Sequence, residues 1–133
     1  MQIIDTVVLL AYLDKSDSKH TKAIEYIHDI GLRDDLFIPS ATMHEVDLEI
    51  KAHGIRYGER AGAYSILSRL IPKDRILPST PSVFRRSSEL SKTTTWRSPY
   101  FDTLIAATGL EYGADSVITT DRKFSKLGIK PVF

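Results

Sequence analysis

The sequence of 133 residues contains no cysteine and no long hydrophobic run. Without cysteine, neither a disulfide nor a thiolate metal site can form, which suits a reducing compartment. The apolar run from Val7 to Leu13 is far shorter than the ~20 residues that span a bilayer, and no basic segment precedes it. We therefore expect a cytoplasmic protein that is neither exported nor inserted into a membrane.

The sequence also lacks the short motifs of several enzyme classes. It contains no G-x-x-x-x-G-K, no G-x-G-x-x-G and no G-x-S-x-G, which argues against nucleotide-cofactor enzymes and serine hydrolases. His44-Glu45 begins like a zinc-protease motif, but Leu48 stands where the second histidine is required. The four histidines have no ligand spacing, so a zinc site is not expected.

Charge is nearly balanced overall but unevenly distributed along the chain. The net charge is +1, whereas residues 1–50 carry ten acids and four bases, and residues 51–97 carry ten bases and three acids. A basic segment beside an acidic one is what a protein needs to hold a phosphate backbone near a metal ion. Solvated, arginine-rich helix faces at 55–71 and 80–92 explain the same pattern equally well.

Short apolar runs alternate with segments of helical periodicity along the whole chain. This alternation predicts a three-layer α/β/α sandwich with a mostly parallel central sheet, and the length suits one domain, 1–133. We expect Thr6 to cap the first helix and residues 92–99 to form a loop. The expected strands are 2–5, 36–39, 75–77, 116–119 and 130–133, and the expected helices are 6–13, 17–30, 40–52, 56–71, 82–91, 100–112 and 122–127.

Four acidic residues stand at or near expected junctions of strand and helix: Asp5, Glu45, Asp102 and Asp121. In an open α/β sheet, the carboxyl ends of the strands form the crevice in which ligands bind. Carboxylates gathered there repel one another unless a hard divalent cation such as Mg²⁺ neutralises them. The pattern therefore predicts metal-assisted chemistry on phosphate.

Each acid also has a purely structural explanation. Asp5 and Asp121 suit helix N-caps, while Glu45 and Asp102 suit exposed first-turn positions that the helix dipole favours. The surroundings of two acids favour a site instead. Asp102 is flanked by apolar residues, and Glu45 shares a helical stripe with alanines and Leu48, so both side chains are expected to point toward the sheet.

These residues also carry a family resemblance. The chain resembles PIN-domain ribonucleases, in particular the small VapC-like toxins of type II toxin–antitoxin pairs. The likeness holds in order and spacing from Met1 to Phe133 and is weakest over residues 51–97. The matching stretches are Ile3-Ile4-Asp5-Thr6, Glu45 in the helix after the second strand, Phe101-Asp102-Thr103-Leu104-Ile105-Ala106-Ala107, and Ile118-Thr119-Thr120-Asp121-Arg122-Lys123-Phe124 followed by Leu127-Gly128-Ile129.

The resemblance implies a single α/β/α nuclease domain that cleaves RNA endonucleolytically with Mg²⁺ or Mn²⁺. Asp5, Asp102 and Asp121 would hold the metal with help from Glu45, and these four residues would form the catalytic set. The hydroxyls of Thr6 and Thr119 would support the site. Basic and aromatic side chains would grip the RNA strand, although partial burial of Trp96 in a loop is an equally good reading; the candidates are Arg85, Arg86, Trp96, Arg97 and Arg122.

Two other functions and two protein partners stay open at this point. The chain could be an RNA-processing nuclease without an antitoxin, or a weakly active PIN-like module that binds RNA or protein; the presence of all four acids favours an enzyme. An antitoxin is expected to insert a tail into the acidic crevice, because carboxylates attract arginine. A homodimer is expected because the apolar faces of the helices at 17–30, 40–52 and 56–71 exceed what one sheet face covers.

Overall fold

The structure is a computed structural model that describes residues 1–32, 34–94 and 100–133. Its sheet has the strand order β3-β2-β1-β4-β5, and every pair of neighbouring strands is parallel. The parallel sheet predicted from the β–α alternation is therefore confirmed. The strands are β1 (Gln2–Ile4), β2 (Leu36–Pro39), β3 (Ile76–Leu77), β4 (Ser116–Ile118) and β5 (Lys130–Val132).

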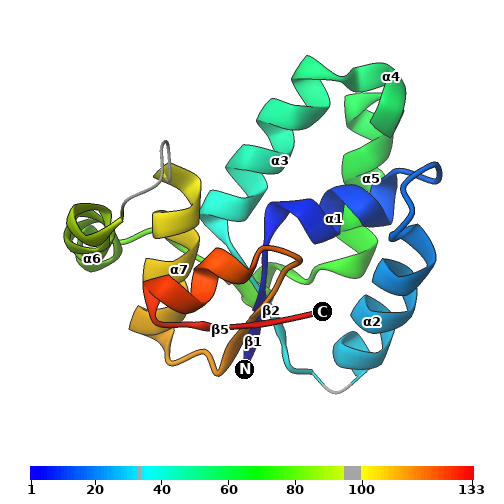
Figure 1. The fold of residues 1–133 in the computed structure, drawn as a ribbon. Coiled ribbons are helices and arrows are strands. Elements are labelled where there is room, and N and C mark those ends of the chain that lie inside the picture. The colour runs from blue at the N-terminus through cyan, green and yellow to red at the C-terminus, as the bar shows by residue number, and fades with distance from the viewer. Residues whose placement is uncertain (33, 95–99) are drawn as a thin grey trace.

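Helices cover both faces of this sheet, as the expected three-layer sandwich requires. Figure 1 shows α6 and α7 on one side of the sheet and α1, α2 and α5 on the other, with α3 extending beyond the strand ends. The helices are α1 (Thr6–Leu13), α2 (His20–Leu32), α3 (Ser40–Ala52), α4 (Gly54–Tyr57), α5 (Arg60–Leu70), α6 (Pro81–Thr93) and α7 (Tyr100–Tyr112), with 3₁₀ segments η1 (Lys73–Arg75) and η2 (Arg122–Leu127). Within the described residues, no helix is long and apolar enough to cross a membrane.

The two faces of the sheet bury separate apolar cores, because successive strand residues point to opposite faces. Ile4, Ile38 and Ile118 pack with residues of α1, α2, α3 and α5. Ile3 and Val117 pack on the other face with α6, α7 and η2. Since β1 lies at the centre of the sheet and both of its isoleucines are fully buried, the residue that follows it is held in a rigid setting.

Several expected boundaries are wrong in detail. The helix expected at 56–71 is divided into α4 and α5, because Gly58 (φ 79°, ψ −167°) adopts a backbone conformation that glycine alone tolerates well. Asp5, and not Thr6, is the N-cap of α1. The loop expected at 92–99 lies partly outside the described residues, while its first two residues continue α6. The segment 122–127 is a helix with the expected bounds, and it is of the 3₁₀ type.

Candidate functional site

The site begins where the two central strands end side by side. β1 pairs with β4, so Asp5 and Thr119, the residues that follow them, become neighbours. Thr119 Oγ1 donates a hydrogen bond of 2.7 Å to Asp5 Oδ2 and accepts one of 3.0 Å from the Asp121 backbone N–H. Thr119 therefore ties two of the predicted acids together through one buried hydroxyl.

Asp5 is the most deeply buried of the four acids, with 4% of its surface exposed. Its other carboxylate oxygen, Oδ1, accepts a 2.7 Å hydrogen bond from the Thr6 N–H at the start of α1. Burial raises the pKa of Asp5 to about 6; the two hydrogen bonds oppose this rise, and the charges of Asp102 and Asp121 add to it. The carboxylate is thus oriented by the protein but held at an electrostatic cost.

Glu45 approaches Asp5 from the second turn of α3. Its pKa is raised to about 7, first by burial and then by the charge of Asp5, with a further contribution from Asp102. The nearby Thr6 hydroxyl lowers the pKa of Glu45 somewhat, although the two side chains do not reach hydrogen-bond geometry. Among the described residues, Glu45 Oε2 and Thr6 Oγ1 are both buried atoms with no hydrogen-bond partner. Two unsatisfied oxygens in one place are costly unless a proton or cation serves them.

Asp102 and Asp121 complete the set from the other side. Asp102 lies in the first turn of α7, and burial, followed by the charge of Asp121, raises its pKa; the charge of Lys123 lowers it. Asp121 caps η2, where its Oδ1 accepts a 2.9 Å hydrogen bond from the Lys123 N–H. All four predicted acids therefore act on one another electrostatically at the carboxyl ends of β1 and β4.

The structural explanations of the acids prove partly right. Asp5 and Asp121 do cap helices, yet both also belong to the cluster. Glu45 is neither exposed nor in a first turn. Leu48, expected on the same inward stripe, is 55% exposed, so that stripe does not run along the whole length of α3.

The donor set fits a hard divalent cation by its chemistry. All four candidate ligands offer carboxylate oxygens, which Mg²⁺ and Mn²⁺ prefer. A cation would stabilise the ionised forms that burial and mutual repulsion now disfavour, and Glu45 Oε2 is an oxygen with no competing partner among the described residues. As the side chains stand, no group of three or more described His, Asp or Glu residues is close enough to share one ion.

The residues expected to grip RNA do not all lie near the acids. Arg86 forms an ion pair with Glu111, which lies nine residues beyond Asp102, roughly 14 Å along α7 at 1.5 Å per residue. Arg122 donates to the Pro131 carbonyl oxygen at 3.3 Å. Arg85 is exposed on α6. Trp96 and Arg97 lie outside the described residues.

Sequence reasoning missed Lys123, the cation whose charge reaches Asp102. Its position two residues after Asp121 could have indicated that it lies beside the acids. The arginines of the basic segment were given more weight, but four of them are already paired with acids of the same chain. These pairs are Arg56–Asp14, Arg60–Asp47, Arg75–Asp34 and Arg86–Glu111.

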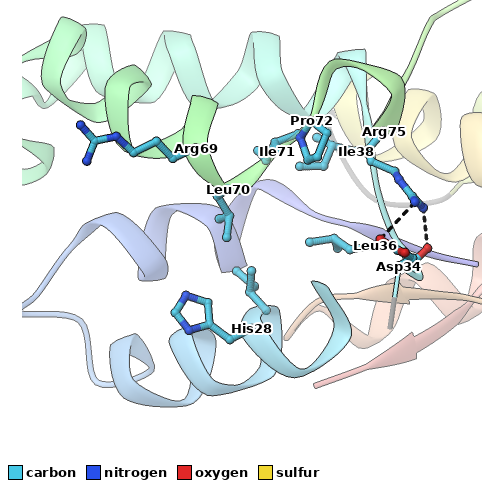
Figure 2. Close-up of a pocket in the computed structure, with 10 residues that line it drawn as sticks. His28, Asp34, Leu36, Ile38, Arg69, Leu70, Ile71, Pro72 and Arg75 are labelled. Atoms are coloured by element: carbon cyan, nitrogen blue, oxygen red, sulfur yellow. Dashed lines mark hydrogen bonds and ion pairs between the residues drawn. The ribbon is translucent and has the colours of Figure 1, made fainter. Parts of the chain in front are cut away.

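Two hollows lie outside the acid cluster. One, of about 330 Å³, has walls from α2, β2 and α5 and a rim that includes His28, Arg69 and the Arg75–Asp34 ion pair of 3.2 Å (Figure 2). The other, of about 580 Å³, lies between α3, α6 and α7 and is lined by Leu48, Phe84 and Tyr100 among others. Neither hollow is lined by any of the four acids.

Comparison with known proteins agrees with this architecture. The model of the PIN domain family matches residues 3–130. A VapC ribonuclease of Aquifex aeolicus is 23% identical over 133 residues, covering 99% of this chain and 96% of the relative. Among solved structures, VapC20 of Mycobacterium tuberculosis, described as a sarcin-ricin loop cleaving toxin, has a TM-score of 0.75 at 16% identity and covers 97% of this chain and 96% of its own.

Two further solved structures are also similar to this chain. FitAcB of Neisseria gonorrhoeae gives a TM-score of 0.73 at 18% identity, covering 100% of this chain and 97% of its own. VapBC2 of Rickettsia felis, solved with a DNA fragment from its promoter, gives a TM-score of 0.71 at 14% identity. It covers 98% of this chain and 96% of its own. These likenesses extend over the whole fold. With a family model that matches nearly its full length, the chain belongs to the PIN domain family.

Proposed function

We propose that this protein is a Mg²⁺- or Mn²⁺-dependent endoribonuclease that acts in the cytoplasm as the toxin of a toxin–antitoxin pair. The observation that carries the proposal is the coupling of four carboxylates at the carboxyl ends of β1 and β4 in a PIN fold. The curated VapC ribonuclease relative aligns over nearly the whole of both chains, which supports the same activity. One domain, 1–133, would carry this function.

The proposed mechanism assigns a role to each acid. Asp5, Asp102 and Asp121 would hold the ion, which when bound supplies an acidified water and neutralises charge on the scissile phosphate. Thr119 and the Thr6 N–H keep the Asp5 carboxylate in one orientation. Glu45, whose Oε2 has no hydrogen-bond partner among the described residues, would assist these three ligands. Cleavage would leave a 5′ phosphate and a 3′ hydroxyl.

Cleavage of a pool of structured RNAs with Mn²⁺ tests this function directly. Asp5→Asn, Asp102→Asn and Asp121→Asn each keep the side-chain shape but remove a charged oxygen, so we expect losses of roughly a hundredfold or more, in the range seen when a key electrostatic group is removed. Glu45→Gln should lose less, and Glu89→Gln on exposed α6 should behave as wild type. Full activity of Asp102→Asn, or of wild type in EDTA, would refute the metal mechanism.

The alternatives to a toxin make different predictions. A weakly active binding module would bind RNA without cleaving it, in Mn²⁺ as in EDTA. An RNA-processing nuclease without an antitoxin would cleave and yet have no small partner encoded beside its gene. Co-expression with the neighbouring short gene product, followed by purification and a cleavage assay, separates these two nucleases: a toxin should copurify with an inhibitor.

An antitoxin partner is part of the proposal. The solved neighbours include the FitAB and VapBC2 assemblies, and the acid cluster offers an arginine-bearing tail a complementary charge. A bound arginine would relieve the repulsion among the acids in the same way as a cation. Excess Mg²⁺ should therefore weaken antitoxin binding if the tail enters the cluster, and should leave it unchanged if the partner binds elsewhere.

A homodimer is also proposed. Most apolar residues of α2, α3 and α5 are buried within one chain, but Leu48 of α3 and Ile66 of α5 stay exposed. Exposed apolar side chains gather around the 580 Å³ hollow: Leu48 (55% exposed), Phe84 (48%) and Tyr100 (61%). A second copy would bury this patch. Two of its residues, Leu48 and Tyr100, lie within three positions of Glu45 and Asp102 in the sequence.

Light scattering at micromolar concentration tests the dimer. We expect wild type to be dimeric and Leu48→Glu to be monomeric, because a charge in the patch would have to be desolvated on association. Ile66→Glu is the matched control, since Ile66 is similarly exposed but lies on α5, away from the hollow. A monomeric wild type would end the dimer proposal.

A further inference from the structure

The acid cluster creates an electrostatic problem for the proposed substrate. A phosphodiester carries a negative charge, and so do the ionised forms of Asp5, Glu45, Asp102 and Asp121. A nuclease of this kind needs a fixed positive charge that meets the phosphate beside the carboxylates. The four arginines of the basic segment that pair with acids of their own chain would first have to break those ion pairs.

Lys123 has the position and the freedom that this task requires. Its backbone N–H is bound to Asp121 Oδ1, so its main chain is fixed to one of the acids. The side chain is exposed and forms no ion pair with any residue of the described part of the chain. Its charge also reaches Asp102, on the neighbouring helix α7. A lysine so placed can turn toward an incoming anion without first releasing another partner.

We propose that Lys123 is a phosphate-contacting residue whose ammonium group holds a non-bridging oxygen of the RNA backbone at the acid cluster. The inference rests on the proposed function for the identity of the anion. Lysine acts here as a compact point charge with three donors, which suits a tetrahedral phosphate without requiring one fixed orientation. The contact would favour the nucleic-acid backbone over any particular base, so it would add affinity and not sequence preference.

RNA binding measured apart from cleavage tests this contact. Fluorescence anisotropy with a labelled, unstructured RNA oligonucleotide is recorded over a range of salt concentrations, once in EDTA and once in Ca²⁺. Lys123→Ala should weaken binding several-fold and lower the slope of log K against log salt by about 0.7, the value for one phosphate contact on a single strand. Lys123→Arg should keep most of the binding affinity and most of the salt slope, because arginine carries the same charge.

Lys130→Ala is the matched control. Lys130 is also an exposed lysine, but it begins β5 in register with Ser116, the first residue of β4, and so lies at the opposite end of the sheet from the acids. Three outcomes would overturn the proposal: equal effects of the two alanine variants, an unchanged salt slope for Lys123→Ala, or no RNA binding by wild type in either buffer. Lys123-dependent binding by a protein that cleaves nothing in Mn²⁺ would instead retain the contact and refute the nuclease.

Discussion

The hydroxyl of Thr119 donates a 2.7 Å hydrogen bond to Asp5 Oδ2, across a sequence separation of 114 residues. The bond is buried and connects the residues that follow β1 and β4, so it joins the first and last thirds of the chain at the candidate site. It also lowers the pKa of Asp5 against the effect of burial. One side chain therefore serves the packing of the strand ends and the ionisation of the central acid.

Thr119→Val should expose this double role. The substitution keeps the shape but leaves Asp5 Oδ2 and the Asp121 N–H without their partner, which should cost about 1–3 kcal/mol of stability by urea unfolding. The pKa of Asp5 should rise further, visible by NMR titration of its carboxyl carbon. Thr119→Ser keeps the hydroxyl and should show much smaller changes. Equal stability of valine variant and wild type would contradict the bond's importance.

The metal-free protein should lose stability as pH rises from about 4 to about 7. The pKa values of Asp5 (about 6) and Glu45 (about 7) lie above the ordinary values of 3.8 and 4.5 for these side chains. The native state then binds more protons than the unfolded state between these values, so the free energy of unfolding falls with rising pH. Urea unfolding in EDTA at pH 5 and pH 7.5 measures the difference.

Glu45→Gln is the control for this pH dependence. It removes the group with the higher pKa, so the upper part of the decline should flatten. Carboxyls whose pKa is lowered, such as Asp14 beside Ser16 and Asp47 beside Arg60, lose their contribution only as the pH falls below about 4 and leave the window unaffected. Higher stability at pH 7.5 than at pH 5 would contradict the raised pKa values of Asp5 and Glu45.

Gly109 should be intolerant of a side chain. It lies in the buried part of α7, where a Cβ would come within 2.6 Å of Ile129 Cδ1 and 2.7 Å of Ile3 Cδ1. Gly109→Ala should therefore destabilise by about 1–3 kcal/mol despite its better helix propensity. Gly62→Ala in α5 meets no atom within 4 Å and should stabilise by roughly 0.5–1 kcal/mol. Thermal melts of both variants decide the comparison.

Much of the fold follows from local patterns. The bounds expected for α1, α3 and α7 agree with the structure. Helix α3 starts directly after β2 and ends at a clear signal, the pair His53-Gly54. Gly113, with φ 73°, is such a signal at the end of α7. The division of the expected helix 56–71 at Gly58 was not foreseen, since glycine is also tolerated inside helices at modest cost.

The grouping of the four acids at one end of the sheet was predictable, but their pKa values were not. Acids at strand ends are local features, and a parallel sheet brings strand ends together. The raised pKa of Glu45 depends on how α3 packs against β1, which a single sequence does not reveal. Ion pairing also depends on contacts between distant residues: Arg86 of α6 forms its ion pair with Glu111 of α7.

The last prediction concerns the conflict between the acids and stability. Asp102 is half-buried, its pKa is raised by burial and by Asp121, and its charge in turn raises the pKa values of Asp5 and Glu45. Asp102→Asn removes one charge from this repulsive set, so the variant should melt at a higher temperature than wild type in EDTA. Glu89→Gln makes the same change of charge at an exposed position of α6 and should leave the melting temperature nearly unchanged.

Added Mg²⁺ should reverse the order of the two proteins. An ion that binds the folded site and not the unfolded chain stabilises wild type by ~2.7 kcal/mol at a hundredfold excess over its dissociation constant. Asp102→Asn has lost one candidate ligand and should gain less at every concentration. If Asp102 were only a first-turn charge that favours the helix dipole, the asparagine variant would be equal or less stable in EDTA and Mg²⁺ would do little to either protein. One series of melts on two proteins therefore distinguishes a metal site from a helix-stabilising charge.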